Sequence, residues 1–333
     1  MPTLEIEEVR TSARLETLAP AWQDLWRRAA RATPFHSPAW LLPWWREIGG
    51  GQLRVLVARR DGRMVGLLPM YLQDEGDGAK LLPLGIAISD YLDGLFEEDG
   101  AGTVADAMLR QLTARDDWRR CELHPLRSGS PLLTARLPAG CMDELLEFEP
   151  CLVLEVPPGA RDLREVIPSG MRANFRQAER RAEKAGRVSF ETATAATISE
   201  ILEAFFQLHE ARWASRDAPG VLADPAIRRF HRAAAPQLLS DGFLRLQSLR
   251  LDERIVAVVY ALFAKGCAYY YLSGFDPEFA TISPGTLTVG HTIRQAIGER
   301  VREFDFLRGR ERFKYSWGAR ERPCYGRMLR RSA

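Results

Sequence analysis

The sequence predicts an α/β protein with two domains, each built from a mixed central β-sheet flanked by helices. The first observation behind this prediction is length, because 333 residues exceed the usual size of one domain. The second is alternation, because segments with strand-like patterns are interspersed with segments of helical periodicity. The third is repetition, since the same order of segments occurs in each half of the chain.

The repeat is clearest in a pair of β-hairpins. LRVLVARRDGRMVGLLPMYL (53–72) aligns without a gap with LRLQSLRLDERIVAVVYALF (244–263). Each stretch has apolar strand-forming residues on both sides of a turn centred on Asp-Gly or Asp-Glu, which is the pattern of a hairpin. A short strand then follows a helical segment in both halves, at 118–127 and at 301–310.

The helices predicted in the second half occupy 169–186, 197–214, 224–242 and 285–301. The last of them connects a strand at 268–273 to a strand at 303–307, and such a crossover pairs its two strands in parallel. In the first half the corresponding helix is expected over 105–117. The stretch 150–159, with three prolines, separates the halves and gives domains 1–150 and 151–333.

Composition excludes several classes of function. Forty-six Lys and Arg against 44 Asp and Glu leave a net charge of +2, so no global field attracts nucleic acid or an anionic bilayer, and anion recognition must be local. We expect no DNA partner. The longest apolar run, 255–263, is far short of the roughly 20 residues of a membrane span, although peripheral membrane contact stays open.

Cysteine usage and the N-terminal residues predict a cytoplasmic protein. The five cysteines form no CxxC pair and are odd in number, which favours reduced thiols over a disulfide framework or a zinc site. The first ten residues, MPTLEIEEVR, lack the pattern of a leader. Walker-type phosphate loops, GxSxG, HExxH and EF-hand patterns are absent from the sequence, so we expect no metal site.

Six stretches resemble a known family: MRANFRQAERRAEKAG (171–186), LHEARW (208–213), FHRAAAPQLLSDGFLRL (230–246), YYYLSGFDP (269–277), SPGTL (283–287) and DFLRGRERFKYSWG (305–318). Together they resemble the GNAT acyltransferase superfamily in its tandem, FemAB-like form, and within it the CelD/BcsL-type proteins. The resemblance implies tandem GNAT-like domains. The first is a degenerate copy, and the second holds the active site.

The resemblance also implies the chemistry. GNAT enzymes transfer an acyl group, typically from a coenzyme A thioester, to an amine or hydroxyl. We therefore expect acyl-CoA as the donor substrate and no permanently bound cofactor. FemAB relatives take aminoacyl groups from aminoacyl-tRNA instead. Relatives linked to exopolysaccharide and to long-chain amine acylation suggest a cell-envelope acceptor, either glycan or lipid. A non-catalytic scaffold in such an assembly system is a further alternative.

Two groups of residues are candidates for holding the donor. The start of the helix after the second hairpin offers free backbone N–H groups to a pyrophosphate, or is simply a well-capped structural helix. The loop after the last strand supplies phosphate-binding or thioester-orienting side chains, or an ion-pair network that closes the domain. The candidates are Ser283, Pro284, Gly285, Thr286, Arg308, Lys314 and Tyr315.

The catalytic candidates are Asp276, His209 and Tyr271. Asp276 follows the end of a strand, where it is placed to take a proton from the acceptor or to form an Asx turn before a proline. His209 is a candidate base or a structural histidine. Strict alternation would put Tyr271 on the same strand face as Tyr269 and Ser273. Direct attack on the thioester requires no covalent enzyme intermediate.

The acceptor candidates lie near these residues. Arg212 and Trp213 share the LHEARW segment with His209. Arg176 belongs to a stripe of arginines spaced four apart on one predicted helix, which glutamates of the same helix would neutralise in the alternative reading. Glu311 either acts on the acceptor or forms an ion pair with Lys314.

Overall fold

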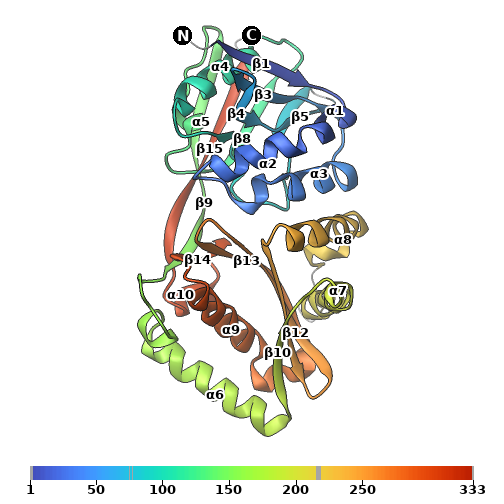
Figure 1. Ribbon diagram of the computed structural model, residues 1–333, viewed down its shortest axis with the longest axis vertical. Coiled ribbons are helices and arrows are strands. Elements are labelled where there is room, and N and C mark those ends of the chain that lie inside the picture. The colour runs from blue at the N-terminus through green and yellow to red at the C-terminus, as the bar shows by residue number, and fades with distance from the viewer. Residues whose placement is uncertain (1–2, 75, 77, 215–218, 332–333) are drawn as a thin grey trace. The chain divides into compact units, whose positions relative to one another are not determined.

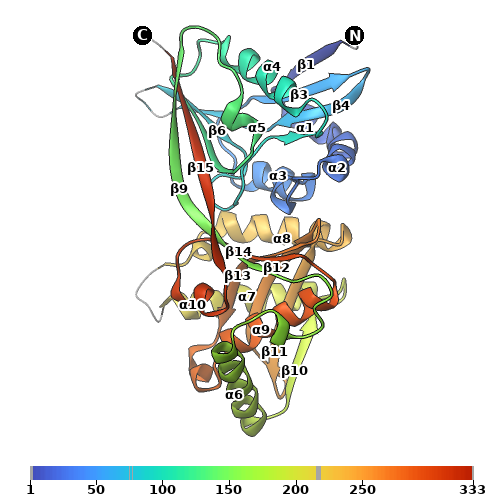
Figure 2. The ribbon, with the colours of Figure 1, turned by 90° about the vertical axis from the view of Figure 1, so that its left-hand side faces the viewer.

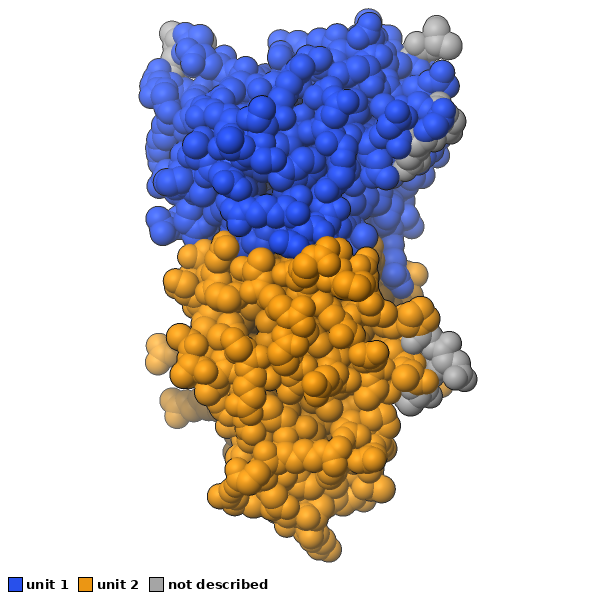
Figure 3. All heavy atoms as spheres, turned by 90° about the vertical axis from the view of Figure 1, so that its right-hand side faces the viewer, with its two compact units in different colours: residues 1–149, 323–333 blue, residues 150–322 orange. Residues whose placement is uncertain are grey.

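The computed structural model describes residues 3–74, 76, 78–214 and 219–331. The chain forms two compact units, residues 1–149 with 323–333 and residues 150–322 (Figure 3). Each unit has β-sheet covered by helices, which confirms the predicted α/β class. None of the described helices is long and apolar enough to cross a membrane.

The first unit contains two sheets, with strand orders β1-β3-β4-β7 and β15-β8-β6-β5-β2. Its predicted hairpin is confirmed as β3 and β4, and Asp61 and Gly62 both have the positive φ that its tight turn requires. Its elements are β1 (Leu4–Val9), α1 (Ser12–Thr17), α2 (Ala19–Arg28), η1 (Pro34–His36), α3 (Pro38–Glu47), β2 (Gln52–Leu53), β3 (Val55–Arg60), β4 (Arg63–Leu68), β5 (Met70–Asp74), β6 (Ala79–Pro83), β7 (Leu95–Phe96), α4 (Ala101–Thr113), β8 (Arg120–Arg127), α5 (Pro131–Thr134) and the start of β9 (Cys141–Glu155).

The second unit has one sheet with the order β10-β11-β12-β13-β14-β9. Helices α7 and α8 cover one face, and α6, α9 and α10 lie on the other (Figure 1). Its elements are η2 (Leu163–Glu165), α6 (Ser169–Ala185), β10 (Val188–Thr192), α7 (Ile198–Ala214), η3 (Val221–Ala223), α8 (Pro225–Ser240), β11 (Leu244–Leu251), β12 (Arg254–Ala264), β13 (Cys267–Phe275), η4 (Pro277–Ile282), α9 (Pro284–Gly298), β14 (Glu303–Arg308) and α10 (Arg312–Ser316).

The predicted parallel crossover is confirmed, and its two strands soon separate. β13 and β14 pair at Cys267↔Glu303, Ala268↔Phe304 and Tyr269↔Asp305, and at no pair beyond these. β14 then bends at Leu307, which has a φ of 61° and donates its N–H to the Asp305 carboxylate at 2.8 Å. The sheet therefore opens between β13 and β14 on the side of their C-terminal ends.

The two halves of the sequence exchange strands. The second part of β9, which follows β8 in sequence, pairs with β14 in the second unit, from Glu303↔Glu155 to Arg308↔Cys151. The second part of β15 (Arg320–Arg331), which follows β14, pairs with β8 in the first unit. Figure 2 shows β15 beside β9. The sequence placed residues 323–333 in the second domain, but this pairing puts them in the first unit, where Leu329 is fully buried.

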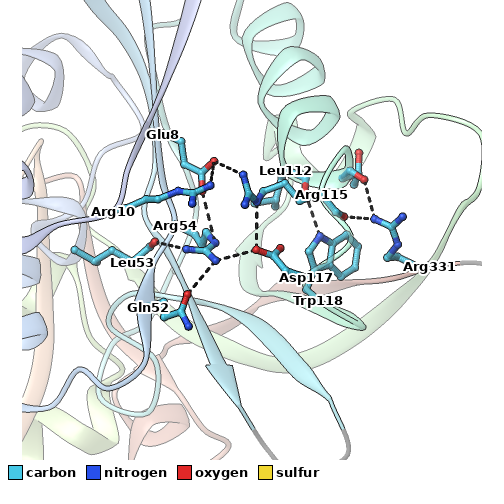
Figure 4. A network of polar contacts seen from close by, with 11 residues as sticks. Glu8, Arg10, Gln52, Leu53, Arg54, Leu112, Arg115, Asp117, Trp118 and Arg331 are labelled. Atoms are coloured by element: carbon cyan, nitrogen blue, oxygen red, sulfur yellow. Dashed lines mark hydrogen bonds and ion pairs between the residues drawn. The ribbon is translucent and has the colours of Figure 1, made fainter.

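A network of charged residues lies beside the end of β15 in the first unit (Figure 4). Arg54 is 5% exposed and contacts the Asp117 carboxylate at 2.8 Å. Glu8 accepts from Arg115 at 3.2 Å, and Arg115 also contacts Asp117 at 3.3 Å. Arg331, at the end of β15, donates to the backbone carbonyls of residues 113 and 115. The network thus fastens β15 to the segment between α4 and β8.

Candidate active site

A cavity of about 460 Å³ lies where β13 and β14 separate. Side chains from β13, α6, α7, α10 and the start of α9 surround it. The lining residues are Met171, Asn174, Gln177, Arg181, Arg212, Tyr270, Ser273, Phe275, Ser283, Gly285, Thr286, Val289, Phe313, Ser316 and Trp317. Among the described residues that line it, none is a carboxylate or a histidine.

A β-bulge decides which tyrosine faces the cavity. The pairing of β12 with β13 shifts between Tyr260↔Leu272 and Ala261↔Tyr270, so Tyr271 is the extra residue. Tyr270 and Ser273 consequently share the cavity face, and the Tyr270 hydroxyl donates to Ser273 Oγ at 2.6 Å. The predicted alternation is therefore wrong here: Tyr271 packs on the opposite face, 5.7 Å from the His231 ring.

Arg212 reaches the same two residues from α7. Its guanidinium donates to Ser273 Oγ at 2.9 Å and to the Ser273 carbonyl at 3.2 Å, and it lies over the Phe275 ring at 5.1 Å. Burial raises the pKa of Tyr270, while nearby Arg212 acts in the opposite direction. The phenol is therefore protonated at neutral pH, and a chain of contacts runs from Arg212 through Ser273 to Tyr270.

The start of α9 forms the rim of the cavity. Ser283 takes a left-handed conformation with φ of 57°, and its carbonyl accepts the N–H groups of Thr286 and Leu287. Arg181 of α6 donates to Ser283 Oγ at 3.0 Å. A Cβ at Gly285 would come no closer than 3.9 Å to another group, so the approach to this helix end is open. The helix dipole and Arg181 together favour an anion here.

The predicted donor residues thus fall into two sets. Ser283, Gly285 and Thr286 line the cavity, and Pro284 begins the helix between them. Arg308, Lys314 and Tyr315 do not line it. The reason for this difference lies in the hydrogen bonds of Lys314 and Tyr315.

Lys314 is a structural residue. It is 3% exposed, and its ammonium donates to the carbonyls of Arg308 at 2.6 Å and of Leu307 and Gly309 at 3.3 Å. It also pairs with Glu311 at 2.9 Å, so the ion-pair alternative for Glu311 is the one observed. These contacts use the donors of Lys314, which corrects its assignment to donor phosphates.

Tyr315 belongs to an exposed ion-pair network instead. Its hydroxyl donates to Glu321 at 2.6 Å, and Arg310 contacts the same carboxylate at 2.9 Å. The loop after the last strand thus forms an ion-pair network, which was the structural alternative to a phosphate site.

Asp276 faces a different cavity. Its carboxylate accepts the Glu278 backbone N–H at 3.0 Å, which caps η4, and pairs with Arg254 at 2.5 Å. It lines a cavity of about 570 Å³ together with Glu200, Glu203 and Arg250. The structure therefore shows the Asx-turn alternative and separates Asp276 from Tyr270.

His209 and Trp213 lie behind β13. His209 is 1% exposed, and a Cβ at Gly274 would be 2.4 Å from its backbone nitrogen, so α7 packs directly on the strand. Burial, followed by the charges of Arg212 and Arg228, lowers the pKa of His209 to about 4. The Trp213 ring is 6.0 Å from the imidazole, and neither residue lines the cavity.

Sequence reasoning missed the α6 and α10 side of the cavity. Met171, Asn174, Gln177 and Arg181 recur at helical spacing on one face of α6, the face away from the arginine stripe. That spacing is a usable signal, because it places two amides and a cation on one face of the predicted helix. Phe313 is 36% exposed at the cavity, which is unusual for such a side chain.

Residues 169–315 match the acetyltransferase (GNAT) domain family. This stretch is a GNAT-type acetyltransferase domain. It runs from the start of α6 into α10, so it contains nearly all of the cavity. The protein is accordingly an enzyme of the acyltransferase class, and its GNAT domain lies in the second unit.

Three solved structures share the fold over nearly the whole chain. FemX has a TM-score of 0.67 at 11% identity, covering 97% of this chain and 96% of its own. The C-terminal domain of a putative lysylphosphatidylglycerol synthetase from Agrobacterium fabrum has 0.60 at 14%, covering 96% and 92%. L-PGS from Bacillus licheniformis has 0.55 at 12%, covering 87% and 91%. No curated protein sequence matches the chain.

Proposed function

We propose that the second unit binds an acyl-CoA in the cavity between β13 and β14 and transfers its acyl group to an amine or hydroxyl of a cell-envelope acceptor. The observation that supports this is the opening of the sheet beside the start of α9. Acyl-CoA needs an anion site for its pyrophosphate and an extended slot for its pantetheine arm. The start of α9, with Arg181 bonded to it, would supply the first, and the stretch of β13 beyond its pairing with β14 would supply the second.

The donor fits residues that the cavity presents. Ser283, Gly285, Thr286 and Arg181 would hold the pyrophosphate, because they combine a helix N-terminus with a cation. Beyond Tyr269 the β14 side of β13 has no strand partner, so its backbone groups are available to the amides of the arm. The thioester would then lie near Tyr270.

The chemistry is a direct transfer. The acceptor attacks the thioester carbonyl, the carbon–sulfur bond breaks, and the departing thiolate takes a proton. Tyr270 is placed to supply this proton, because burial keeps it protonated and the Arg212–Ser273 contacts stabilise the phenolate that remains. The acceptor's proton would pass to water, because none of the described lining residues is a carboxylate or a histidine and Glu311 is paired with Lys314 at 2.9 Å.

The acceptor class rests on resemblance. Two of the proteins that share the fold bear names of lysylphosphatidylglycerol synthesis, which concerns a membrane lipid. The CelD/BcsL-type resemblance in the sequence points to envelope polymers or long-chain amines. Both sources favour an acceptor of the cell envelope, either a glycan or a lipid.

Calorimetric titration with coenzyme A, acetyl-CoA and a long-chain acyl-CoA tests the proposal. We expect saturable binding, weakened about tenfold in Arg181→Gln because a charge-assisted contact is lost. Arg180→Gln is the matched control, since the neighbouring arginine lies outside the cavity lining. Preference for the long chain would support a lipid acceptor. Absence of binding to all three compounds would refute the thioester donor, and aminoacyl-tRNA would then be titrated as the alternative.

A further inference from the structure

A second cavity of the second unit is dominated by arginines. It has a volume of about 550 Å³ and lies between α6, α9 and the loop that contains η2. Arg161, Arg164, Arg172, Arg176 and Arg294 line it, and Asp162 is the single acid among its lining residues. We call this cavity the arginine pocket. Its lining has a strong positive charge in a chain whose net charge is only +2.

Most of this charge is uncompensated. Arg164 pairs with Asp162 at 2.7 Å, and Arg294 pairs with Glu179 at 2.6 Å. Within the described part of the chain, the guanidinium groups of Arg161, Arg172 and Arg176 have no ion pair, and the buried Nε of Arg172 has no hydrogen-bond partner. Arg161 and Arg176 are exposed and Arg172 is half-buried, so an anion in the cavity would meet one partly desolvated guanidinium and two solvated ones.

The arginine pocket is separate from the proposed donor site. On α6, a rotation of about 100° per residue places Arg172 and Arg176 roughly opposite the face that carries Asn174, Gln177 and Arg181. On α9, Arg294 lies about 14 Å along the axis from the helix start at about 1.5 Å per residue. An anion in the arginine pocket would therefore be a different group from the pyrophosphate proposed at the start of α9.

We propose that the arginine pocket binds the diphosphate group of a second ligand. Guanidinium groups prefer to hold phosphate oxygens two at a time, and a single phosphate has too few oxygens to satisfy three such forks. A diphosphate has more oxygens and more charge. The lining also includes the buried Phe175 ring, with Arg294 lying over it at 4.5 Å. This site goes beyond the proposed acyl transfer, which does not need it.

Titration with inorganic pyrophosphate tests the proposal on the full chain. The double variant Arg172→Gln/Arg176→Gln should lose about a hundredfold in affinity, about tenfold for each guanidinium. Arg180→Gln should bind as the wild type does, because Arg180 lies outside both cavities, and Arg181→Gln should keep binding in the arginine pocket while losing any pyrophosphate held at the start of α9. Orthophosphate and sulfate at equal ionic strength should bind at least about tenfold more weakly.

The melting temperature shows whether the double variant still folds. Without added anion the double variant should melt at a higher temperature than the wild type, because repulsion between the guanidinium groups is relieved. Equal pyrophosphate affinity of the double variant and the wild type would overturn the proposal, as would loss of binding in Arg181→Gln alone or equal binding of sulfate. Coenzyme A titrated into the same variants tests the donor site separately, so either site can fail without the other.

Two competitors then identify the carrier of the diphosphate. A nucleoside diphosphate that displaces pyrophosphate indicates a soluble ligand. Binding to vesicles that contain a long-chain alkyl diphosphate, lost in the double variant, indicates a lipid. Failure of both competitors would overturn the proposal.

Discussion

Helices α4 and α9 occupy matching places in the two units and have the same pair, Gly-Thr, as their second and third residues, at Gly102 and at Gly285. Each lies between two strands that pair in parallel, β6 and β8 for α4, with β7 also between them, and β13 and β14 for α9. What precedes them differs. α4 follows Glu-Glu-Asp at 97–99, whereas α9 follows Ser283, with Arg181 bonded to it. The residues ahead of this helix therefore differ in charge between the two units.

The cavities beside the two helices show the same contrast. The one near α4 has a volume of about 180 Å³, and its lining includes two acids, Asp93 and Glu98, and one cation, Arg31. Burial raises the pKa of Asp93, whose carboxylate accepts the hydroxyl of Ser130 at 2.7 Å and the N–H of Gly94 at 2.8 Å. In the first unit, Arg54 and Arg115 are held by carboxylates, whereas Arg172 and Arg176 of the second unit are not (Figure 4).

The largest expected effect comes from removing the exchanged strand. A chain that ends at Arg322 lacks the part of β15 that pairs with β8, including the fully buried Leu329. We expect the first unit to become sensitive to protease while the second unit, whose residues are all present, still binds coenzyme A. Hydrogen exchange would locate the loss. A chain that ends at Arg331 is the control. If the backbone amides of β8 still exchanged hydrogen slowly in the shorter chain, pairing with β15 would not stabilise the first unit.

The second prediction concerns the two neighbouring tyrosines. Tyr270→Phe should lower kcat about a hundredfold with little change in KM, because the proton for the leaving thiolate is lost. Tyr271→Phe should leave kcat unchanged, since that ring packs against His231 and Tyr260 on the other face. Steady-state kinetics with acetyl-CoA measure both. An equal fall in kcat for Tyr271→Phe would show that the bulge does not select the catalytic face.

A third test places an acidic residue at the start of α9, as acidic residues precede α4. Gly285→Glu should raise the KM for acyl-CoA about tenfold, because a carboxylate there opposes the pyrophosphate by about 1–2 kcal/mol. Gly102→Glu is the matched control in the first unit, where a Cβ meets nothing within 4 Å. If Gly102→Glu raised the KM for acyl-CoA, the result would contradict binding of the donor in the second unit.

The smallest expected effect is a difference in acid stability. Burial lowers the pKa of His231 to about 3, so the folded state keeps it neutral while the unfolded state binds a proton below about pH 6.5. Its contribution is complete above pH 6.5 and falls by about 2 kcal/mol between pH 7 and pH 5. His36 behaves similarly in the first unit, but the second unit also contains His209 and His291. Hydrogen exchange at both pH values should show the second unit opening first, and the reverse order would refute this account.

The sequence predicts what depends on local pattern. Both hairpins are confirmed, and so is the parallel crossover, because their turn residues and apolar runs determine them. Helix boundaries are less exact: α4 begins at Ala101 rather than 105, directly after Gly100 with its φ of 78°. The start of α9 and Arg212 do line the cavity, although their roles stay predictions.

What the sequence could not predict depends on pairing between distant segments. The bulge that turns Tyr270 into the cavity arises from the register of β12 against β13, and nothing in the YYY triplet distinguishes its members. Lys314 looks like a phosphate ligand in sequence, but the bend of β14 at Leu307 brings three carbonyls to its ammonium. The exchange of β9 and β15 is equally invisible, since either strand would suit either sheet.

That exchange also sets an order of events during synthesis. Residues 1–149 are translated before the second unit, yet the strand that pairs with β8, the second part of β15, is translated only after it. At about 5–20 residues per second, β8 waits roughly 10 to 40 seconds for its partner. The second unit, contiguous from residue 150 to 322, is complete before then. The half that is made first is therefore the half that finishes last, and its open strand edge is where a nascent chain needs protection.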